Sequence, residues 1–156
     1  MNKKLISYEK ALTKAMYLCS RSEKCKSDIK KKLYDWNSDP NHHEKIINEL
    51  TDQKFIDEKR FATYFVRDKF RFNKWGKIKI RIQLFQKNLP EELINDALKQ
   101  ISDQEYGEML KNVINNKLKQ LKPETPYTLK NKLLRHASSK GFEPDLILKT
   151  IEDIKI

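Results

Sequence analysis

The sequence predicts an all-α protein in which three tandem three-helix repeats form an elongated, curved array. Charged residues make up 35% of the 156 residues and hydrophobic residues 38%, with only three Gly and five Pro. This balance favours helices with solvated outer faces over a sheet protein with many turns. Apolar pairs occupy corresponding places at Ile29–Leu33, Ile80–Leu84 and Leu133–Ala137, 51 and 53 residues apart. A recurrence at about 50 residues indicates stacked repeats with a long inner face.

Three units are expected, over residues 1–57, 58–101 and 102–156. Helices are predicted over residues 6–20, 25–37 and 43–54 in the first unit, and over residues 58–72, 77–87 and 90–101 in the middle unit. The last unit is predicted to begin near Asp103. Its second helix is expected to end at Gly141 as a glycine cap, and its closing helix to start at Pro144.

The core of the middle unit is expected on either side of a break at Trp75-Gly76. Apolar residues recur there at helical spacing: Phe61, Tyr64, Phe65, Ile78, Ile82 and Phe85. Phe70 and Phe72 flank Arg71, so at most one of the two rings can join the buried stripe. The other ring is then exposed and available for contact.

The sequence predicts different environments for the two tryptophans. Trp36 extends the Ile29–Leu33 stripe and is expected in the core of the first unit. Trp75 lies between Lys74 and Lys77 at the helix junction. It either staples two helices of its own unit, or stacks on a nucleic-acid base or fills a pocket of a partner.

Positive charge is concentrated in the middle unit. The net charge is +11, to which the three units contribute +3, +6 and +2. Between residues 67 and 87 the only acid is Asp68, against eight basic residues: Arg67, Lys69, Arg71, Lys74, Lys77, Lys79, Arg81 and Lys87. A charge run is usually a solvated face, but the lack of compensating acids favours a face that meets a polyanion. Either DNA phosphates or acidic side chains of a protein fit this charge.

Several other classes find no support in the sequence. No apolar run approaches the roughly 20 residues of a membrane span, and MNKKLISYEKALTK lacks the apolar segment of a secretory signal. Cys19 and Cys25 form neither a disulfide framework nor a common zinc pattern, so a reducing, cytoplasmic setting is expected. His42-His43 follows a Pro-Asn turn and is expected in a surface turn, not a metal site.

Catalytic motifs are also missing. The sequence contains no nucleophile with a local base, no paired carboxylates on one helical face and no glycine-rich phosphate loop. The prediction is a non-enzymatic protein that uses no cofactor and does not itself hydrolyse nucleotide.

Short motifs follow one another in a fixed order along the chain. The middle unit opens with Asp57-Glu58-x-x-Phe61-Ala62 and continues with Arg67, Arg71, Gly76-Lys77-x-x-Ile80 and Lys87-Asn88-Leu89. The last unit carries Lys140-Gly141-Phe142, and the first carries Leu18, Arg21 and Ile29-x-x-x-Leu33. In order and spacing, these motifs resemble the RecX family, the regulators of the RecA recombinase.

The sequence departs from the family pattern at two positions. Cys25 stands where the family usually has a serine that caps the second helix, so a weak cap is expected. Asn88 replaces the usual glycine, which is tolerable because asparagine also adopts the left-handed conformation.

The resemblance implies an all-helical arc that binds in the groove of a RecA–DNA filament. It implies lower recombinase and ATPase activity, in DNA repair and the SOS response, with no chemistry of the protein's own. The expected partners are the RecA filament and single- and double-stranded DNA, contacted directly or through the filament, by a monomer. The alternatives are a stand-alone helical DNA-binding module and a scaffold for an acidic protein. The candidate contact residues are Lys30, Arg67, Lys69, Arg71, Lys74, Trp75, Lys77, Lys79, Arg81 and Arg135.

Overall fold

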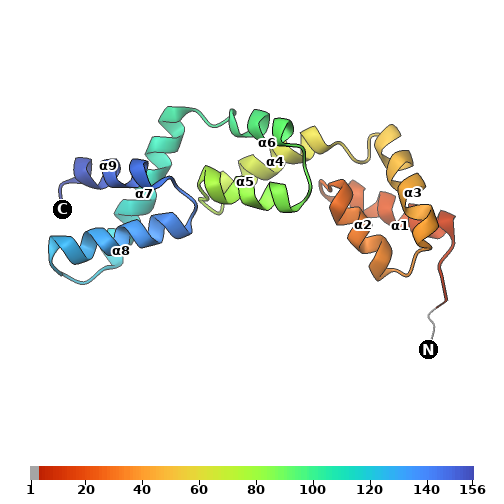
Figure 1. Cartoon of the computed structure of the whole chain (residues 1–156), viewed down its shortest axis with the longest axis horizontal. Helices are drawn as coiled ribbons and strands as arrows, with labels where there is room; N and C mark the ends of the chain where they lie inside the picture. The colour runs from red at the N-terminus through yellow and green to blue at the C-terminus, as the bar shows by residue number, and fades with distance from the viewer. Residues whose placement is uncertain (1–3) are drawn as a thin grey trace.

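The computed structural model describes residues 4–156, and this range contains nine α-helices and no β-strand. Figure 1 shows them in three groups of three along an arc, with the first group at the right. The helices are α1 (Tyr8–Arg21), α2 (Lys26–Asp35), α3 (Pro40–Asp52), α4 (Glu58–Arg71), α5 (Lys77–Gln86), α6 (Glu91–Leu98), α7 (Asp103–Gln120), α8 (Pro126–Ser139) and α9 (Pro144–Ile154). The predicted fold class is confirmed. The residue boundaries expected between the units stay a prediction. Residues 1–3, which belong to the expected first unit, lie outside the described residues.

The three repeats are built on one helix-ending motif. The pairs Ile29–Leu33, Ile80–Leu84 and Leu133–Ala137 are all buried, as predicted. Four residues after each pair, Asn37, Asn88 and Gly141 have φ of 59°, 63° and 98°. The next amide donates back to the helix, from Ser38 to Leu33 O at 3.0 Å, from Leu89 to Leu84 O at 3.3 Å and from Phe142 to Ala137 O at 3.2 Å. These are Schellman caps, and Asn88 does adopt the left-handed conformation expected of it.

The three repeats have two cores. The first repeat has its own core around α1, α2 and α3, which includes Ile29, Leu33 and Ile46. The middle and third repeats share one continuous core. Tyr106 of α7 joins them, because its ring centroid lies 6.1 Å from that of Phe70 in α4 and 5.2 Å from that of Phe142. The described array is therefore one small helical body next to a larger, fused one.

The predicted core of the middle repeat is partly wrong. Phe61 is buried and Phe65 packs against the core, but Tyr64 is 53% exposed. In α5 the buried residues are Ile80 and Leu84, whereas the other apolar residues of the helix face solvent: Ile78, Ile82 and Phe85. Because α5 is apolar on two sides, periodicity alone did not show which side packs. The prediction for the paired phenylalanines is confirmed, with Phe70 6% and Phe72 80% exposed.

The prediction for the histidine pair is also wrong. Helix α3 begins at Pro40, capped by Asp39, whose Oδ1 accepts from Asn41 N at 3.0 Å. His43 therefore lies in the helix and is buried, with Nε2 3.2 Å from Ser38 O and its ring edge-on to Tyr34. Proline fits the first helical turn, so the Pro-Asn pair starts this helix and is not a separate turn.

Two further observations complete the fold. Trp36, expected in the core, packs against the core of the first repeat but stays partly exposed, with Lys14 Nζ 4.8 Å from its ring centroid. Within residues 4–156 no helix combines the length and the hydropathy needed to cross a bilayer.

Candidate functional site

Close packing of two glycines fixes the position of α5. The C-terminal end of α8 meets the N-terminal end of α5, where Gly76 N donates to Lys140 O at 2.7 Å and Ile78 N donates to Gly141 O at 3.0 Å. These bonds pair the free amides of one helix start with the free carbonyls of a helix end. A Cβ on Gly76 would lie 2.3 Å from Gly141 O, and one on Gly141 would lie 2.4 Å from Lys79 Cβ. Only glycine permits this contact.

Tyr106 closes the same junction from the side. Its hydroxyl accepts a hydrogen bond from Lys77 N at 2.9 Å and donates one to Glu143 Oε1 at 2.6 Å. Burial and the bond to Glu143 raise the pKa of Tyr106 above its ordinary value. The first turn of α5 and the start of α9 are thus tied through one side chain. Nothing in the sequence pattern pointed to Tyr106 or Glu143 as a bridge.

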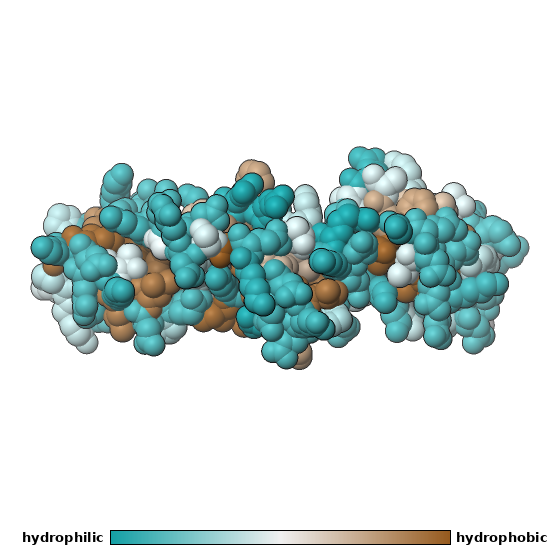
Figure 2. Space-filling view, turned by 90° about the horizontal axis from the view of Figure 1, so that it is seen from above, coloured by the Kyte–Doolittle hydropathy of each residue, from teal (hydrophilic) through white to brown (hydrophobic). Residues whose placement is uncertain are grey.

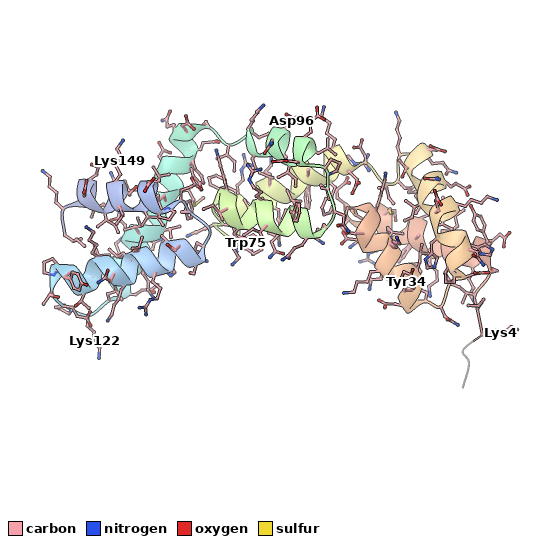
Figure 3. All side chains as sticks on the ribbon, viewed as in Figure 1. Lys4, Tyr34, Trp75, Asp96, Lys122 and Lys149 are labelled. Atoms are coloured by element: carbon pink, nitrogen blue, oxygen red, sulfur yellow. The ribbon has the colours of Figure 1, made fainter. Side chains whose placement is uncertain are left out.

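Trp75 gathers two of the predicted site residues. Its ring packs against the shared core and is partly buried. Lys69 Nζ lies 5.3 Å and Lys79 Nζ 4.6 Å from its centroid, so cations from α4 and α5 meet over one indole. Of the two possibilities for Trp75, this arrangement supports the packing one. Figure 3 places Trp75 on the lower side of the array, opposite Asp96 of α6.

The other predicted cations of the middle repeat have separate surroundings. Lys77 Nζ lies 4.8 Å from the ring centroid of Tyr106. Arg81 Nη1 donates to Asn95 Oδ1 of α6 at 2.5 Å. Arg67 and Arg71 border a hollow of about 70 Å³ between α4 and the end of α6. Lys74 adopts a left-handed conformation, with φ 57°, in the turn after α4.

The two outer candidates lie apart from the middle repeat's cations. Arg135 is exposed on α8. Lys30 lines a groove between the first and middle repeats, together with Lys26, Lys87 and Asn88. The structure therefore brings together the cations around Trp75 and leaves Lys30 and Arg135 as separate contributors.

The junction between the first and middle repeats is looser than the glycine junction. Cys25 and Asn88 occupy the places that Gly76 and Gly141 hold at the other junction, as their common 51- and 53-residue offsets show. Among the described residues no backbone hydrogen bond joins the start of α2 to the end of α5, and a groove of about 510 Å³ lies there, lined by Lys26 and Asn88 among others. The Cys25 thiol is fully buried and packs into the core shared by the middle and third repeats. Although no serine stands here, Cys25 and Asp28 form a capping box at the start of α2, so the weak cap expected from the missing serine stays a prediction.

An ion pair crosses this junction. Lys87 Nζ lies 2.7 Å from Asp28 Oδ1, and the backbone N of Cys25 donates to Asp28 Oδ2 at 3.3 Å. Burial tends to raise the pKa of Asp28, but the hydrogen bond and charge of Lys87 outweigh it, so the pKa lies below its ordinary value. Lys87, counted in the basic run by sequence, is therefore committed to a contact within the chain.

We expect Lys87→Met to lower the free energy of unfolding by about 1 kcal/mol at pH 7, which is the contribution typical of a partly exposed ion pair. A lowered pKa of Asp28 adds stability above its unfolded value near 3.9, and this stability is lost as the pH falls through the folded value. The difference between wild type and variant should therefore become smaller as the pH falls below the unfolded pKa of about 3.9. Urea unfolding of both proteins at pH 7 and pH 3 measures this difference in the free energy of unfolding.

Lys111→Met is the matched control, because Lys111 is exposed on α7 and forms no ion pair with any described residue. We expect no pH-dependent loss there. An equal loss for Lys87→Met at both pH values would contradict a role for Asp28.

The charge of the site suits the binding of anions. Apart from Lys69, which lies 3.9 Å from Asp68 Oδ2, the candidate cations between residues 67 and 81 form no ion pair with any described residue. No group of three or more His, Cys, Asp or Glu residues with the arrangement of a metal site occurs in the described part of the chain. Unpaired cations on a rigid helical support can bind phosphates or carboxylates.

Comparisons with known proteins agree with this architecture. A family model described as the second three-helix domain of RecX matches residues 57–98, and one described as the third three-helix domain matches residues 103–151. The regulatory protein RecX of Acinetobacter baylyi is 31% identical over 150 residues, which cover 96% of this chain and 91% of that protein. That of Clostridium tetani is 30% identical, and the match covers 87% of this chain but only 63% of the relative.

Solved structures have the same fold. A crystal structure of a regulatory protein RecX matches with a TM-score of 0.86 and 26% identity, over 94% of this chain and 73% of that one. RecX from Lactobacillus salivarius matches with a TM-score of 0.82 and 22% identity, over 94% and 96% of the two chains. With two of its three repeats matched by the family's own domain models, this chain belongs to the RecX family of regulatory proteins.

Proposed function

We propose that this protein regulates the RecA recombinase by binding in the groove of the RecA–DNA filament and lowering its recombinase and ATPase activity. Membership of the family supports the regulatory role. The observation that carries the binding mode is the set of cations without ion pairs on the middle repeat of a curved array. The protein acts in this proposal as a cytoplasmic monomer in DNA repair and the SOS response, without catalysis of its own.

The proposed mechanism is occlusion. The fused middle and third repeats form a stiff body, because the glycine contact and the Tyr106 bridge hold α5 against α8 and α9. A stiff arc that spans adjacent RecA subunits would compete with incoming duplex DNA. It would also restrict the subunit motions that accompany ATP turnover.

The test measures ATP hydrolysis by cognate RecA on single-stranded DNA, titrated with this protein at fixed salt, beside its binding to the same DNA alone. We expect inhibition at concentrations well below those needed to bind naked DNA. Inhibition that only follows DNA binding would replace this proposal with a stand-alone DNA-binding module, whose affinity falls steeply with salt.

Charge reversal tests the assigned face. Arg71→Glu with Lys74→Glu should raise the protein concentration needed for half-inhibition by about tenfold or more, because two attractive contacts become repulsive. Helicity should stay unchanged, since neither side chain forms an ion pair in the described structure. The charge-matched control is Lys111→Glu with Lys149→Glu, two exposed residues on α7 and α9. Equal losses in both variants would show an effect of net charge and exclude a specific face.

A further inference from the structure

The outward side of α5 is apolar. Ile78, Ile82 and Phe85 are 40%, 48% and 70% exposed and follow each other at four- and three-residue spacing, so they form one line along the helix, here called the α5 stripe. The core side of the same helix is already filled by Ile80 and Leu84, both fully buried. Single exposed apolar residues are ordinary, but three adjacent ones on one helix mark an interaction surface.

The repeat itself does not require this stripe. In α2 the equivalent positions are Ser27, Lys31 and Tyr34, and in α8 they are Asn131, Arg135 and Ser138. Both helices have the same cap and the same buried pair as α5. The apolar stripe is therefore a property of the middle repeat alone and contributes nothing that the common fold needs.

The α5 stripe is bordered by positive charge. Helix α5 has no acidic residue. Lys79 lies on one side of the stripe, over Trp75, and Arg81 on the other, beside Asn95 of α6. In Figure 1, α5 runs along the lower, concave edge of the arc, because α4 and α6 pack on its other sides. The face seen from above in Figure 2 is mostly hydrophilic, with hydrophobic areas mainly over the third repeat.

We propose that the α5 stripe is a docking surface for a protein partner that presents apolar side chains bordered by carboxylates. The apolar line matches apolar side chains, and the flanking cations match carboxylates. This assignment rests on the proposed function and deepens it. It states that α5 contacts the protein of the filament and that cations away from the stripe contact DNA.

Two other occupants fit this surface less well. Two of the three stripe residues are isoleucines, which can neither neutralise phosphates nor stack on bases as aromatic rings do, and interfaces with nucleic acid are more polar than this stripe. A second copy of the chain would bring two +11 molecules together and place the flanking cations of both copies close to one another.

The test replaces the stripe with uncharged residues in the triple variant Ile78→Asn, Ile82→Gln and Phe85→Ser. Binding is measured by fluorescence anisotropy to cognate RecA assembled on single-stranded DNA, and separately to that DNA alone. We expect the affinity for the assembled filament to fall by about 30-fold or more, as for a group of central interface residues. Affinity for naked DNA should stay within about twofold, because no cation is removed.

Tyr17→Ser with Tyr127→Ser is the matched control. It removes two rings that are 59% and 77% exposed on α1 and α8, away from the stripe, and should leave filament binding unchanged. Unchanged filament binding by the triple variant would overturn the stripe assignment alone. A parallel loss of naked-DNA binding would make the stripe a nucleic-acid surface, and a wild-type dimer that the triple variant abolishes would assign it to a second copy. A wild-type chain that binds no filament would remove the proposed function and the stripe assignment together.

Discussion

Gly76→Ala is expected to loosen the third repeat from the middle one and to lower the free energy of unfolding by about 2–3 kcal/mol, the cost of overpacking a tight contact. The added Cβ would lie 2.3 Å from Gly141 O, 2.4 Å from Gly141 C and 2.5 Å from Phe142 N, all backbone atoms. No side chain can move aside to relieve these contacts. The end of α8 must therefore move away from α5, and the bonds to Lys140 O and Gly141 O are lost with it. Thermal unfolding followed by circular dichroism measures the loss.

Gly107→Ala provides the control for this substitution. Gly107 lies inside α7, and no atom lies within 4 Å of the Cβ that alanine would add. Since alanine favours the helix, we expect a gain of about 0.5–1 kcal/mol. A wild-type melting temperature for Gly76→Ala would contradict the close approach of the two helix ends.

Ile29→Ala and Ile80→Ala are expected to destabilise different parts of the chain, although the two residues occupy the same place in their repeats. Each is fully buried, so each substitution should cost about 2–5 kcal/mol. Ile29 belongs to the core of the first repeat and Ile80 to the core shared by the middle and third repeats. Ile29→Ala should raise amide hydrogen exchange within α1–α3, whereas Ile80→Ala should raise it in both α4–α6 and α7–α9.

Hydrogen exchange measured by mass spectrometry on peptides separates these outcomes, and each variant serves as the control of the other. Slow exchange in α7–α9 of Ile80→Ala would contradict a shared core. Fast exchange throughout Ile29→Ala would show that the first repeat is not independent of the others.

The sequence by itself determined the repeat. Its spacing of about 50 residues located the buried pairs Ile29–Leu33, Ile80–Leu84 and Leu133–Ala137, because burial at a helix end restricts residue type strongly. It also identified Gly141 as a cap, since a left-handed residue after a helix favours glycine. The concentration of charge in the middle repeat was visible as well, because charge can be counted without coordinates.

Only the tertiary structure decided how the repeats meet and which sides of the helices remain free. Local periodicity placed Ile78, Ile82 and Phe85 in the core, but α5 has two apolar sides and the packing of α4 and α6 selects the other one. The bridge through Tyr106, the ion pair of Lys87 with Asp28 and the unequal junctions at Gly76 and Cys25 join residues far apart in the chain. Such contacts depend on the distance between folded units, which a repeating pattern within each unit does not encode.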